Sequence, residues 1–174
     1  RNGHIDIIDL LLSRQRQKEE EDAPLHVDIS SGDGTTPLHM ACYGGHPTAV
    51  QHLIETHSAN IHALNEWECG CAHWAAMSLG NEGIEKVIEL CIYLKQRGAS
   101  FVQRQKQGHT PLHKAASRKN RHVIEWLATS SLFSEEERKA MGAKDVGGNC
   151  PSDVWLSVGG EEEFGLWMKE KWNW

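Results

Sequence analysis

Four side chains that could act as acids, bases or metal ligands recur at regular intervals along the chain. His39, His73 and His113 occupy equivalent positions of a repeated segment, and Asp153 takes that position in a fourth copy. The first two are 34 residues apart, and each later pair is 40 apart. Imidazole nitrogens can move protons or bind a metal ion. The regular recurrence favours another role, in which each imidazole bridges backbone groups of adjacent units. The change to Asp153 in the last copy fits this structural role, because a terminal unit can do without the full bridge.

Cys69, Cys71 and His73 offer a sharper metal-binding alternative, because thiolate and imidazole are zinc ligands. The Cys-x-Cys-x-His spacing is close for a zinc hairpin, however, and no second Cys/His pair follows at the distance that zinc sites use. Cys71 also aligns with the proline that starts the helix in other copies, and His73 aligns with the recurring histidine. We therefore expect no metal site, no cofactor and no catalytic residue.

The recurring histidines belong to a self-similar block. The segment 34–42 (GTTPLHMAC) returns at 108–116 as GHTPLHKAA. A degraded copy, ECGCAHWAA, lies between them at 68–76, and a fourth copy follows at 148–155. Self-similarity at a fixed period of roughly 20 to 50 residues is typical of stacked repeats rather than of one globular core.

The block resembles the ankyrin repeat, whose unit of about 33 residues carries the signature T-P-L-H-x-A. The signature is complete at Thr36–Ala41 and at Thr110–Ala115. The segments 98–102 (GASFV) and 123–127 (VIEWL) are similar to the closing loop and the second helix of that unit. The resemblance covers nearly the whole chain. It implies an all-α fold, an ankyrin-type solenoid of stacked helix-turn-helix repeats with short hairpin loops.

On this resemblance we expect a single ankyrin-repeat domain over residues 1–174. Its parts are 1–31, a partial first repeat with a charged insertion; 32–64, a repeat; 65–103, a long repeat; 104–142, a repeat with an insertion; and 143–174, a C-terminal capping repeat. The insertions at 14–31, 78–84 and 129–142 depart from the regular unit. Insertions in repeat proteins usually form loops on one face.

Each complete signature also predicts how its helix begins and what it packs against. Thr36 and Thr110 can cap a helix by accepting a hydrogen bond from a free backbone N–H, and the proline after each suits the first helical position. Gly44 and Gly45 can end the first helix. The apolar face of the next helix consists of Ala49, Val50, Leu53 and Ile54. One helix pair cannot bury such a face alone, so neighbouring units must stack.

Three further helices are expected outside the regular pattern. Ile84–Leu94 has the spacing of an extended amphipathic helix, and Ser134–Glu137 is a capping box that opens a short helix. Glu161–Trp174 is typical of a closing helix, with acidic residues at its start and lysines near its end. Trp172 and Trp174 exceed what such a cap requires, and they either pack back on the stack or meet a partner.

Composition narrows the classes of partner and location. The 174 residues carry a net charge of −6, and the isoelectric point is about 6.0. This balance argues against nucleic acid and anionic membrane surfaces, because phosphate binding needs a basic face. No apolar run reaches the roughly 18 residues that span a bilayer, so membrane insertion is not expected.

Five cysteines without a regular disulfide framework indicate a reducing, intracellular compartment, with the cytoplasm expected and an organelle left open. Because the chain begins in mid-repeat, we expect it to be a fragment of a longer protein.

In the ankyrin family, the variable positions are the hairpin tips and the exposed face of each first helix, which together line a concave groove. Carried over by position, the expected partner-binding residues are Met40, Tyr43, Trp67, Trp74, Met77, Lys106, His109, Lys114 and Arg118. Trp, Tyr, Met and Arg are the usual anchors of protein interfaces. Trp67 is the most suggestive, because a hairpin tip is ordinarily polar. Trp74 and Met77 can alternatively pack against neighbouring units.

The favoured function is a non-catalytic scaffold that binds a partner protein through its concave groove. The alternatives are a structural subunit of a large multiprotein assembly and an ankyrin module that binds a small ligand. No glycine-rich phosphate loop, nucleophile elbow or paired-carboxylate site is visible in the sequence. The shape of the contact separates these hypotheses, because a scaffold buries a broad patch of about 1,200–2,000 Å², whereas a ligand needs a concave pocket.

Overall fold

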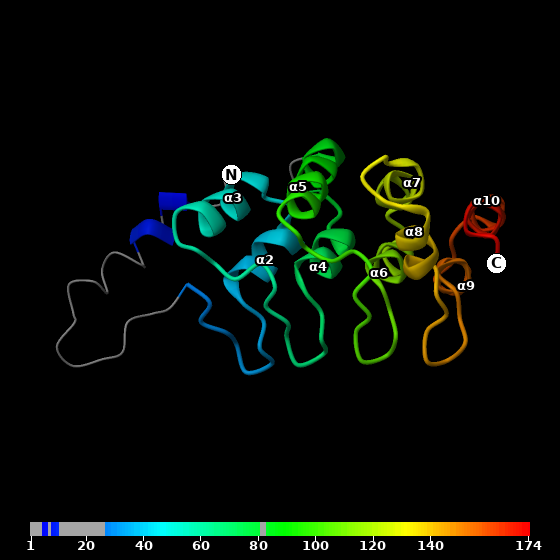
Figure 1. Cartoon of the computed structure of the whole chain (residues 1–174), viewed down its shortest axis with the longest axis horizontal. Helices are drawn as coiled ribbons and strands as arrows, with labels where there is room; N and C mark the ends of the chain where they lie inside the picture. Colours follow the sequence, from blue (N-terminus) through cyan, green and yellow to red (C-terminus); the bar gives the residue numbers. More distant parts are fainter. Residues whose placement is uncertain (1–4, 7, 11–26, 81–82) are drawn as a thin grey trace.

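The computed structural model is a row of paired helices with hairpins projecting from one side (Figure 1). It describes residues 5–6, 8–10, 27–80 and 83–174, and these contain helices and turns but no strand. Residues 5–6 and 8–10 are helical. The later helices are α2 (Pro37–Gly44), α3 (Pro47–Glu55), α4 (Cys71–Met77), α5 (Ile84–Gln96), α6 (Pro111–Ser117), α7 (Arg121–Thr129), α8 (Glu135–Met141), α9 (Pro151–Ser157) and α10 (Glu162–Trp172). The expected all-α solenoid is confirmed, while most of the insertion at 14–31 lies outside the described residues.

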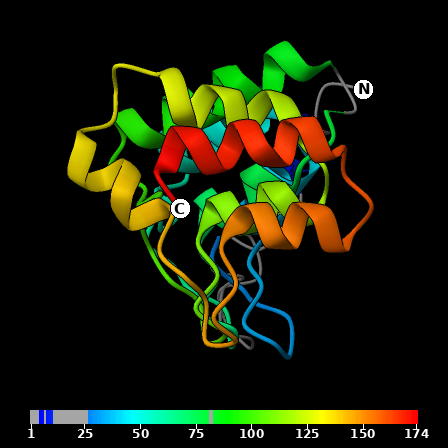
Figure 2. The same cartoon turned by 90° about the vertical axis from the view of Figure 1, so that its right-hand side faces the viewer.

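The helices form two layers, which Figure 2 shows from the end of the stack. The first helices α2, α4, α6 and α9 contact one another in sequence, and the second helices α3, α5 and α7 do the same behind them. α10 packs on α9 at the C-terminal end of the described stack. The buried side chains where first helices meet are small, and include Cys42, Ala75, Ala76, Ala115 and Ala116. Small side chains allow helices to approach closely, so successive repeats share one continuous core.

The first helix of a repeat begins and ends much as its residues predict. The Thr36 hydroxyl accepts a hydrogen bond from the His39 N–H at 3.3 Å, and Pro37 follows at the first helical position. Gly45 ends α2 in the left-handed conformation with φ of 69°. Thr110 differs, because its hydroxyl donates to the Met141 carbonyl oxygen at 2.7 Å. That bond joins the start of α6 to the end of α8.

The hairpins between repeats share one geometry. In each, a backbone N–H donates to the carbonyl oxygen four residues later; the pairs are Ser31–Thr35, Asn65–Cys69, Gln105–His109 and Asp145–Asn149, at 2.9–3.2 Å. Neighbouring tips are also joined by backbone hydrogen bonds; these run from Glu66 N–H to Asp33 O (2.8 Å), from Lys106 N–H to Trp67 O (3.1 Å) and from Val146 N–H to Gln107 O (3.0 Å). The hairpins therefore form a continuous row that holds each tip beside the next.

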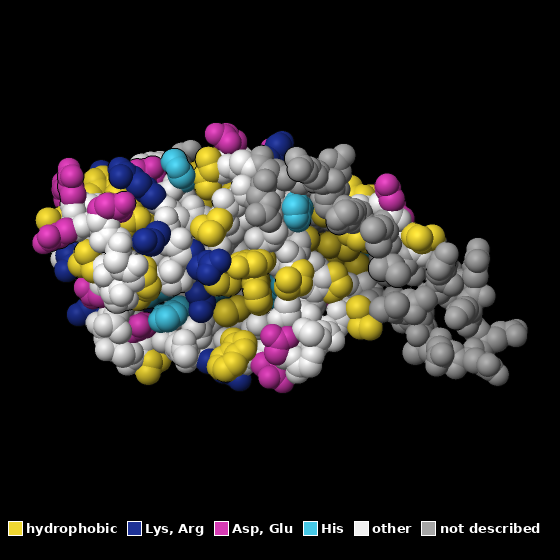
Figure 3. All heavy atoms as spheres, turned by 180° about the vertical axis from the view of Figure 1, so that it is seen from behind, with side chains coloured by type: hydrophobic (Ala, Val, Ile, Leu, Met, Phe, Trp, Pro, Cys, Tyr) yellow, Lys and Arg dark blue, Asp and Glu magenta, His cyan; other side chains and the backbone are white. Residues whose placement is uncertain are grey.

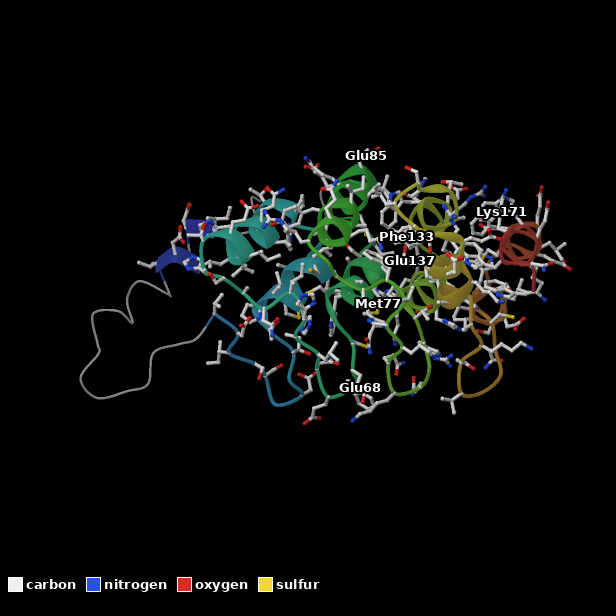
Figure 4. The ribbon with its side chains drawn as sticks, viewed as in Figure 1. Glu68, Met77, Glu85, Phe133, Glu137 and Lys171 are labelled. Atoms are coloured by element: carbon white, nitrogen blue, oxygen red, sulfur yellow. The ribbon has the colours of Figure 1, made fainter. Side chains whose placement is uncertain are left out.

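The expected extra helices are present and pack on the stack. α5 is 13 residues long, and Ser134 forms the capping box that opens α8. Glu137 on α8 forms an ion pair with Lys95 of α5, whose ammonium lies 4.8 Å from the centroid of the Phe133 ring (Figure 4). The insertion at 129–142 thus fastens the third full repeat to the second.

The closing helix resolves the alternative left open for its tryptophans. Trp172 is 9% exposed, and its Nε1–H donates to the Arg138 carbonyl oxygen at 2.9 Å. Trp174 stacks on it with ring centroids 5.5 Å apart. Both rings therefore pack back on the stack.

Candidate functional site

The recurring histidines connect backbone groups within and between repeats, as expected. In His39 and His113, Nδ1 accepts a hydrogen bond from the N–H three residues earlier, at 3.2 Å in both cases. Nε2 reaches a carbonyl oxygen of the following connection, Ala63 at 3.0 Å for the first and Asn149 at 3.3 Å for the second. A carbonyl only accepts, so Nε2 carries the proton and each ring is the neutral tautomer.

His73 makes the same two bonds, and this bears on the Cys-x-Cys-x-His alternative. Its Nδ1 accepts from the Gly70 N–H at 3.3 Å, and its Nε2 lies 3.2 Å from the His109 carbonyl oxygen. Neither ring nitrogen is directed at Cys69 or Cys71, and both thiols are buried. The geometry gives His73 a role in holding repeats together.

Burial controls the protonation of His73 and His113. Because burial disfavours the charged imidazolium, it lowers the pKa of His73 to about 4 and that of His113 to about 4. Asp153 keeps only the local part of the pattern, accepting from the Cys150 N–H at 2.9 Å, and it lies 3.6 Å from the ammonium of Lys169. The last repeat thus relaxes the bridge where α10, rather than another repeat, follows.

Three of the nine expected partner-binding residues meet in one cluster. The rings of Tyr43 and Trp74 are edge to face, with centroids 5.8 Å apart. Arg118 Nη2 donates to the Tyr43 hydroxyl oxygen at 3.0 Å, and its guanidinium carbon lies 5.9 Å from the Tyr43 ring centroid. These side chains come from α2, α4 and the C-terminal end of α6, so three successive repeats contribute. We call the exposed side of these helices, with the hairpin tips 65–69 and 105–109, the inner face.

Trp74 has more of a supporting position in this cluster than Tyr43 or Arg118. It is half-buried, and it stacks on the ring of His39 with centroids 6.0 Å apart. Its Nε1 is buried and has no hydrogen-bond partner among the residues that the structure describes. Trp74 therefore lies between the buried His39 ring and the Tyr43 ring and supports the latter.

The remaining expected residues surround the cluster. Met40 and Trp67 are 54% and 56% exposed, while Met77 and Lys114 are half-buried. Figure 4 labels Met77 among the first helices. Figure 3 looks at the molecule from the side opposite to Figure 1 and shows hydrophobic side chains gathered beside Lys and Arg side chains over its middle. The inner face thus combines apolar and basic groups with the exposed Glu66 and Glu68 of the tip 65–69.

The expected partner-binding residues of the hairpins differ in their exposure and contacts. Lys106 is exposed, and its N–H is bonded to the Trp67 carbonyl oxygen, so the two side chains start from adjoining tips. His109 is engaged within the fold: its Nε2 lies 3.1 Å from a carboxylate oxygen of Asp145, and its ring stacks on His113 with centroids 5.1 Å apart. Trp67 and Lys106 are therefore exposed side by side, whereas His109 mainly supports the row of hairpins.

A hollow of about 500 Å³ between α7 and α10 bears on the small-ligand alternative. It is lined in part by Arg121, Glu125, Phe164 and Trp167. Arg121 forms an ion pair with Glu125 at 2.8 Å and lies over the Phe164 ring at 4.5 Å. The one basic group among its lining residues, Arg121, is thus already engaged within the chain.

The structure also brings together three residues that sequence reasoning did not single out. His52 Nε2 and His57 Nε2 lie 2.6 and 3.0 Å from the same carboxylate oxygen of Asp9. Hydrogen bonds from the two rings hold the pKa of the Asp9 carboxyl below its usual value. Histidines five residues apart around the end of α3 were a weak signal, and nothing in the sequence linked them to an aspartate 43 residues upstream.

Comparison with known proteins identifies the family. The family model described as ankyrin repeats (3 copies) matches residues 1–90, and the model described as ankyrin repeats (many copies) matches residues 72–128. The first match alone covers more than half of the chain, so the chain belongs to the ankyrin repeat family. Members of this family are generally protein–protein interaction modules.

Two curated relatives are similar over part of the chain. One is the ankyrin repeat and SAM domain-containing protein 6 of Mus musculus, 36% identical over 90 residues. The other is the protein of the same name of Rattus norvegicus, 31% identical over 90 residues. Each match covers 52% of this chain but 9% of the relative. The chain therefore corresponds to a small part of those proteins. Among the described helices, none is long and apolar enough to cross a membrane.

Proposed function

We propose that this chain is a non-catalytic module that binds a partner protein on its inner face. The observation that carries this proposal is the cluster of Tyr43, Trp74 and Arg118, built from three successive repeats. A surface assembled from several repeats holds its side chains at fixed separations, because each repeat is packed against the next. Rigid aromatic and arginine side chains are the residues that most often dominate interface energies.

The charges of the inner face indicate what the partner offers. Lys106, Lys114 and Arg118 lie on this face and outnumber the exposed Glu66 and Glu68 of the tip 65–69, although the chain as a whole has a net charge of −6. A local basic region on an acidic chain favours a partner with acidic groups and steers its approach. Met40 and Trp67 add exposed apolar surface. The partner is therefore expected to present an apolar side chain flanked by acidic ones.

Trp67 is the side chain whose loss should matter most. A partner that covers it removes a large aromatic surface from water, and such an anchor contributes about 2 kcal/mol or more to binding. Trp67→Ala should then weaken binding about thirtyfold, at about 1.4 kcal/mol per tenfold change. The fold should tolerate this change, because the ring is 56% exposed in the free chain.

The test begins with capture of partners from native extract on the wild-type chain, with identification by mass spectrometry. The affinity of the captured protein is then measured by titration calorimetry for wild type, Trp67→Ala and Arg118→Glu. Leu166→Ala is the matched control, because Leu166 is a 60% exposed apolar side chain on α10, outside the inner face. If Leu166→Ala weakens binding and Trp67→Ala does not, the partner binds elsewhere and the proposal is wrong.

The same experiment addresses the two alternatives. A structural subunit of a large assembly would bring down several proteins together, and changes on more than one face would reduce their recovery. A small-ligand module would keep its ligand affinity in the Trp67→Ala and Arg118→Glu variants if the ligand occupied the hollow near Phe164.

A further inference from the structure

Asp9, His52 and His57 form a compact group in which three ligand-type atoms converge on one point. The Nε2 atoms of the two histidines are 3.3 Å apart, and each lies within 3.0 Å of Asp9 Oδ1. Within the described ranges, this is the only group of three or more His, Cys, Asp or Glu ligands whose ligand atoms lie within 4.8 Å of one another. It lies apart from the inner face, at the junction of the first helical segment with α3.

We propose that this group binds a divalent transition-metal ion of the zinc class, with two imidazole nitrogens and one carboxylate oxygen as ligands. Zinc takes such ligands in tetrahedral geometry, with Zn–N distances of about 2.0–2.1 Å. Two nitrogens at that distance from a tetrahedral ion are about 3.3–3.4 Å apart, which follows from the tetrahedral angle. The observed Nε2–Nε2 separation of 3.3 Å fits this value.

Hydrogen bonds to Asp9 can hold this group together without an ion, but they crowd the two ring nitrogens. If both Nε2 atoms carry protons, two N–H groups point at one oxygen while their nitrogens are 3.3 Å apart. If both rings are imidazolium, two positive charges face a single carboxylate. A metal ion removes the conflict, because both nitrogens then present lone pairs and the carboxylate offsets part of the ion's charge.

The surroundings suit a metal site as well. The Nδ1 of His52 lies 3.2 Å from the Thr56 hydroxyl oxygen, which can accept a hydrogen bond from Nδ1–H and so leave the lone pair of Nε2 for the ion. The two rings are nearly perpendicular, with an interplanar angle of 79°, so their nitrogens approach the ion from different directions. The side chain of Asp9 is 49% exposed and can withdraw by about half an ångström to reach the Zn–O distance. With three protein ligands, the fourth position is open to water.

Binding would join two consecutive repeats through residues 43 or more positions apart. Asp9 belongs to the first helical segment, whereas His52 and His57 flank the end of α3. An ion held by both would restrain the first segment on the rest of the stack. A ligand that binds the folded chain raises its thermal midpoint.

The experiment uses the full chain and Zn²⁺ or Co²⁺ as the probe. Titration calorimetry should find one Zn²⁺ per chain, and Co²⁺ should give a tetrahedral visible spectrum without a thiolate band in the near ultraviolet. His57→Ala and Asp9→Asn should each weaken Zn²⁺ binding more than about tenfold, the lower end of the loss seen when an outer partner of a metal ligand is removed. Thr56→Val should weaken it by about tenfold.

His122→Ala is the matched control, because His122 is an exposed histidine on α7 in another repeat. It should leave Zn²⁺ affinity unchanged. Circular dichroism without metal checks that each variant keeps its helices. A wild-type affinity no tighter than that of His57→Ala would overturn the proposal, and so would a thiolate band from Co²⁺ that persists in His57→Ala, since the ion would then lie on cysteines.

Discussion

His113 and His57 belong to different repeats, and their ring nitrogens have different kinds of neighbour. His113 accepts from the Thr110 N–H at one nitrogen and lies 3.3 Å from the Asn149 carbonyl oxygen at the other. His57 directs Nε2 at two side chains, Asp9 at 3.0 Å and His52 at 3.3 Å. The first ring connects backbone groups that recur in every full repeat. The second contacts a side chain of its own repeat and one of the preceding segment, His52 and Asp9.

The difference shows how position decides the role of a histidine. A ring bonded at both nitrogens to backbone is fixed in one tautomer and has no lone pair for a metal or a proton. A ring whose Nε2 faces other side chains keeps that nitrogen available. In a repeat protein, shared positions therefore stabilise the stack, and function is to be sought at positions that one repeat does not share with the others.

The largest expected effect is the loss of stability in acid that the shared histidines His73 and His113 cause. Burial lowers the pKa of His73 and His113 to about 4, below the ordinary value of 6.5. Since the unfolded chain then binds more protons than the folded chain between these values, the free energy of unfolding falls as the pH drops through this window. Each ring contributes up to about 1.4 kcal/mol per pH unit. Urea unfolding at about pH 7 and about pH 5 measures the loss.

A variant that lacks one of these rings provides the check on that slope. His73→Asn should be less stable at neutral pH but should lose less stability on acidification, because one proton-binding group has been removed from the unfolded chain. A slope unchanged by His73→Asn would mean that other groups govern the acid response.

Removing a shared ring should also cost more than removing an unshared one. His113→Ala leaves the buried Thr110 N–H without a partner, which costs about 1–3 kcal/mol, and it removes a fully buried ring. The Asn149 carbonyl oxygen still accepts from the Asp145 N–H. We expect a total loss of about 3 kcal/mol in the free energy of unfolding. His57→Ala without metal should cost less than about 1 kcal/mol, because its partner Asp9 is open to water. Equal losses of stability in His113→Ala and His57→Ala would contradict the proposed difference between shared and unshared histidines.

The last repeat suggests a partial rescue. Asp153 shows that a short acceptor side chain can make the local bond, since its carboxylate accepts from the Cys150 N–H at 2.9 Å. His113→Asn should therefore recover the bond to the Thr110 N–H but not the one to the Asn149 carbonyl. Its stability should lie between those of wild type and His113→Ala in the same urea titration.

The sequence was sufficient for features that depend on local chemistry or on the repeat. The complete signatures predicted α2 and α6, the apolar spacing predicted α5, and Ser134 predicted the start of α8. These follow from capping, helical periodicity and burial by the next unit, which involve residues close in sequence or one period apart.

Other contacts could not be foreseen, because they depend on how repeats are placed relative to one another. Arg118 reaches Tyr43 across 75 residues, and this requires the spacing and rotation of three stacked repeats. The approach of Asp9 to His52 likewise depends on how the first segment packs on α3. A repeat signature specifies that units stack, but the side chains that meet on the surface depend on small rotations between units.

The hairpins offer the same contrast between shared and unshared positions, with a smaller expected effect. Gly34, Gly108 and Gly148 have φ near 80° at the position before the end of the hairpin, where the second hairpin has Glu68 with φ of 62°. A residue with a Cβ is strained in this left-handed region by about 1 kcal/mol. The strained residue follows Trp67, the exposed ring proposed to anchor the partner, and Figure 4 shows Glu68 among the hairpin tips.

Glu68→Gly should therefore raise the free energy of unfolding by up to about 1 kcal/mol, since glycine adopts this conformation without the strain. The converse change, Gly108→Ala, should destabilise the chain, because an added Cβ would lie 2.9 Å from the Val146 backbone nitrogen of the next hairpin. Thermal or urea unfolding of both variants gives the two signs. A destabilising Glu68→Gly would show that the carboxylate stabilises the tip, and this hairpin would then differ from the others by more than its strain.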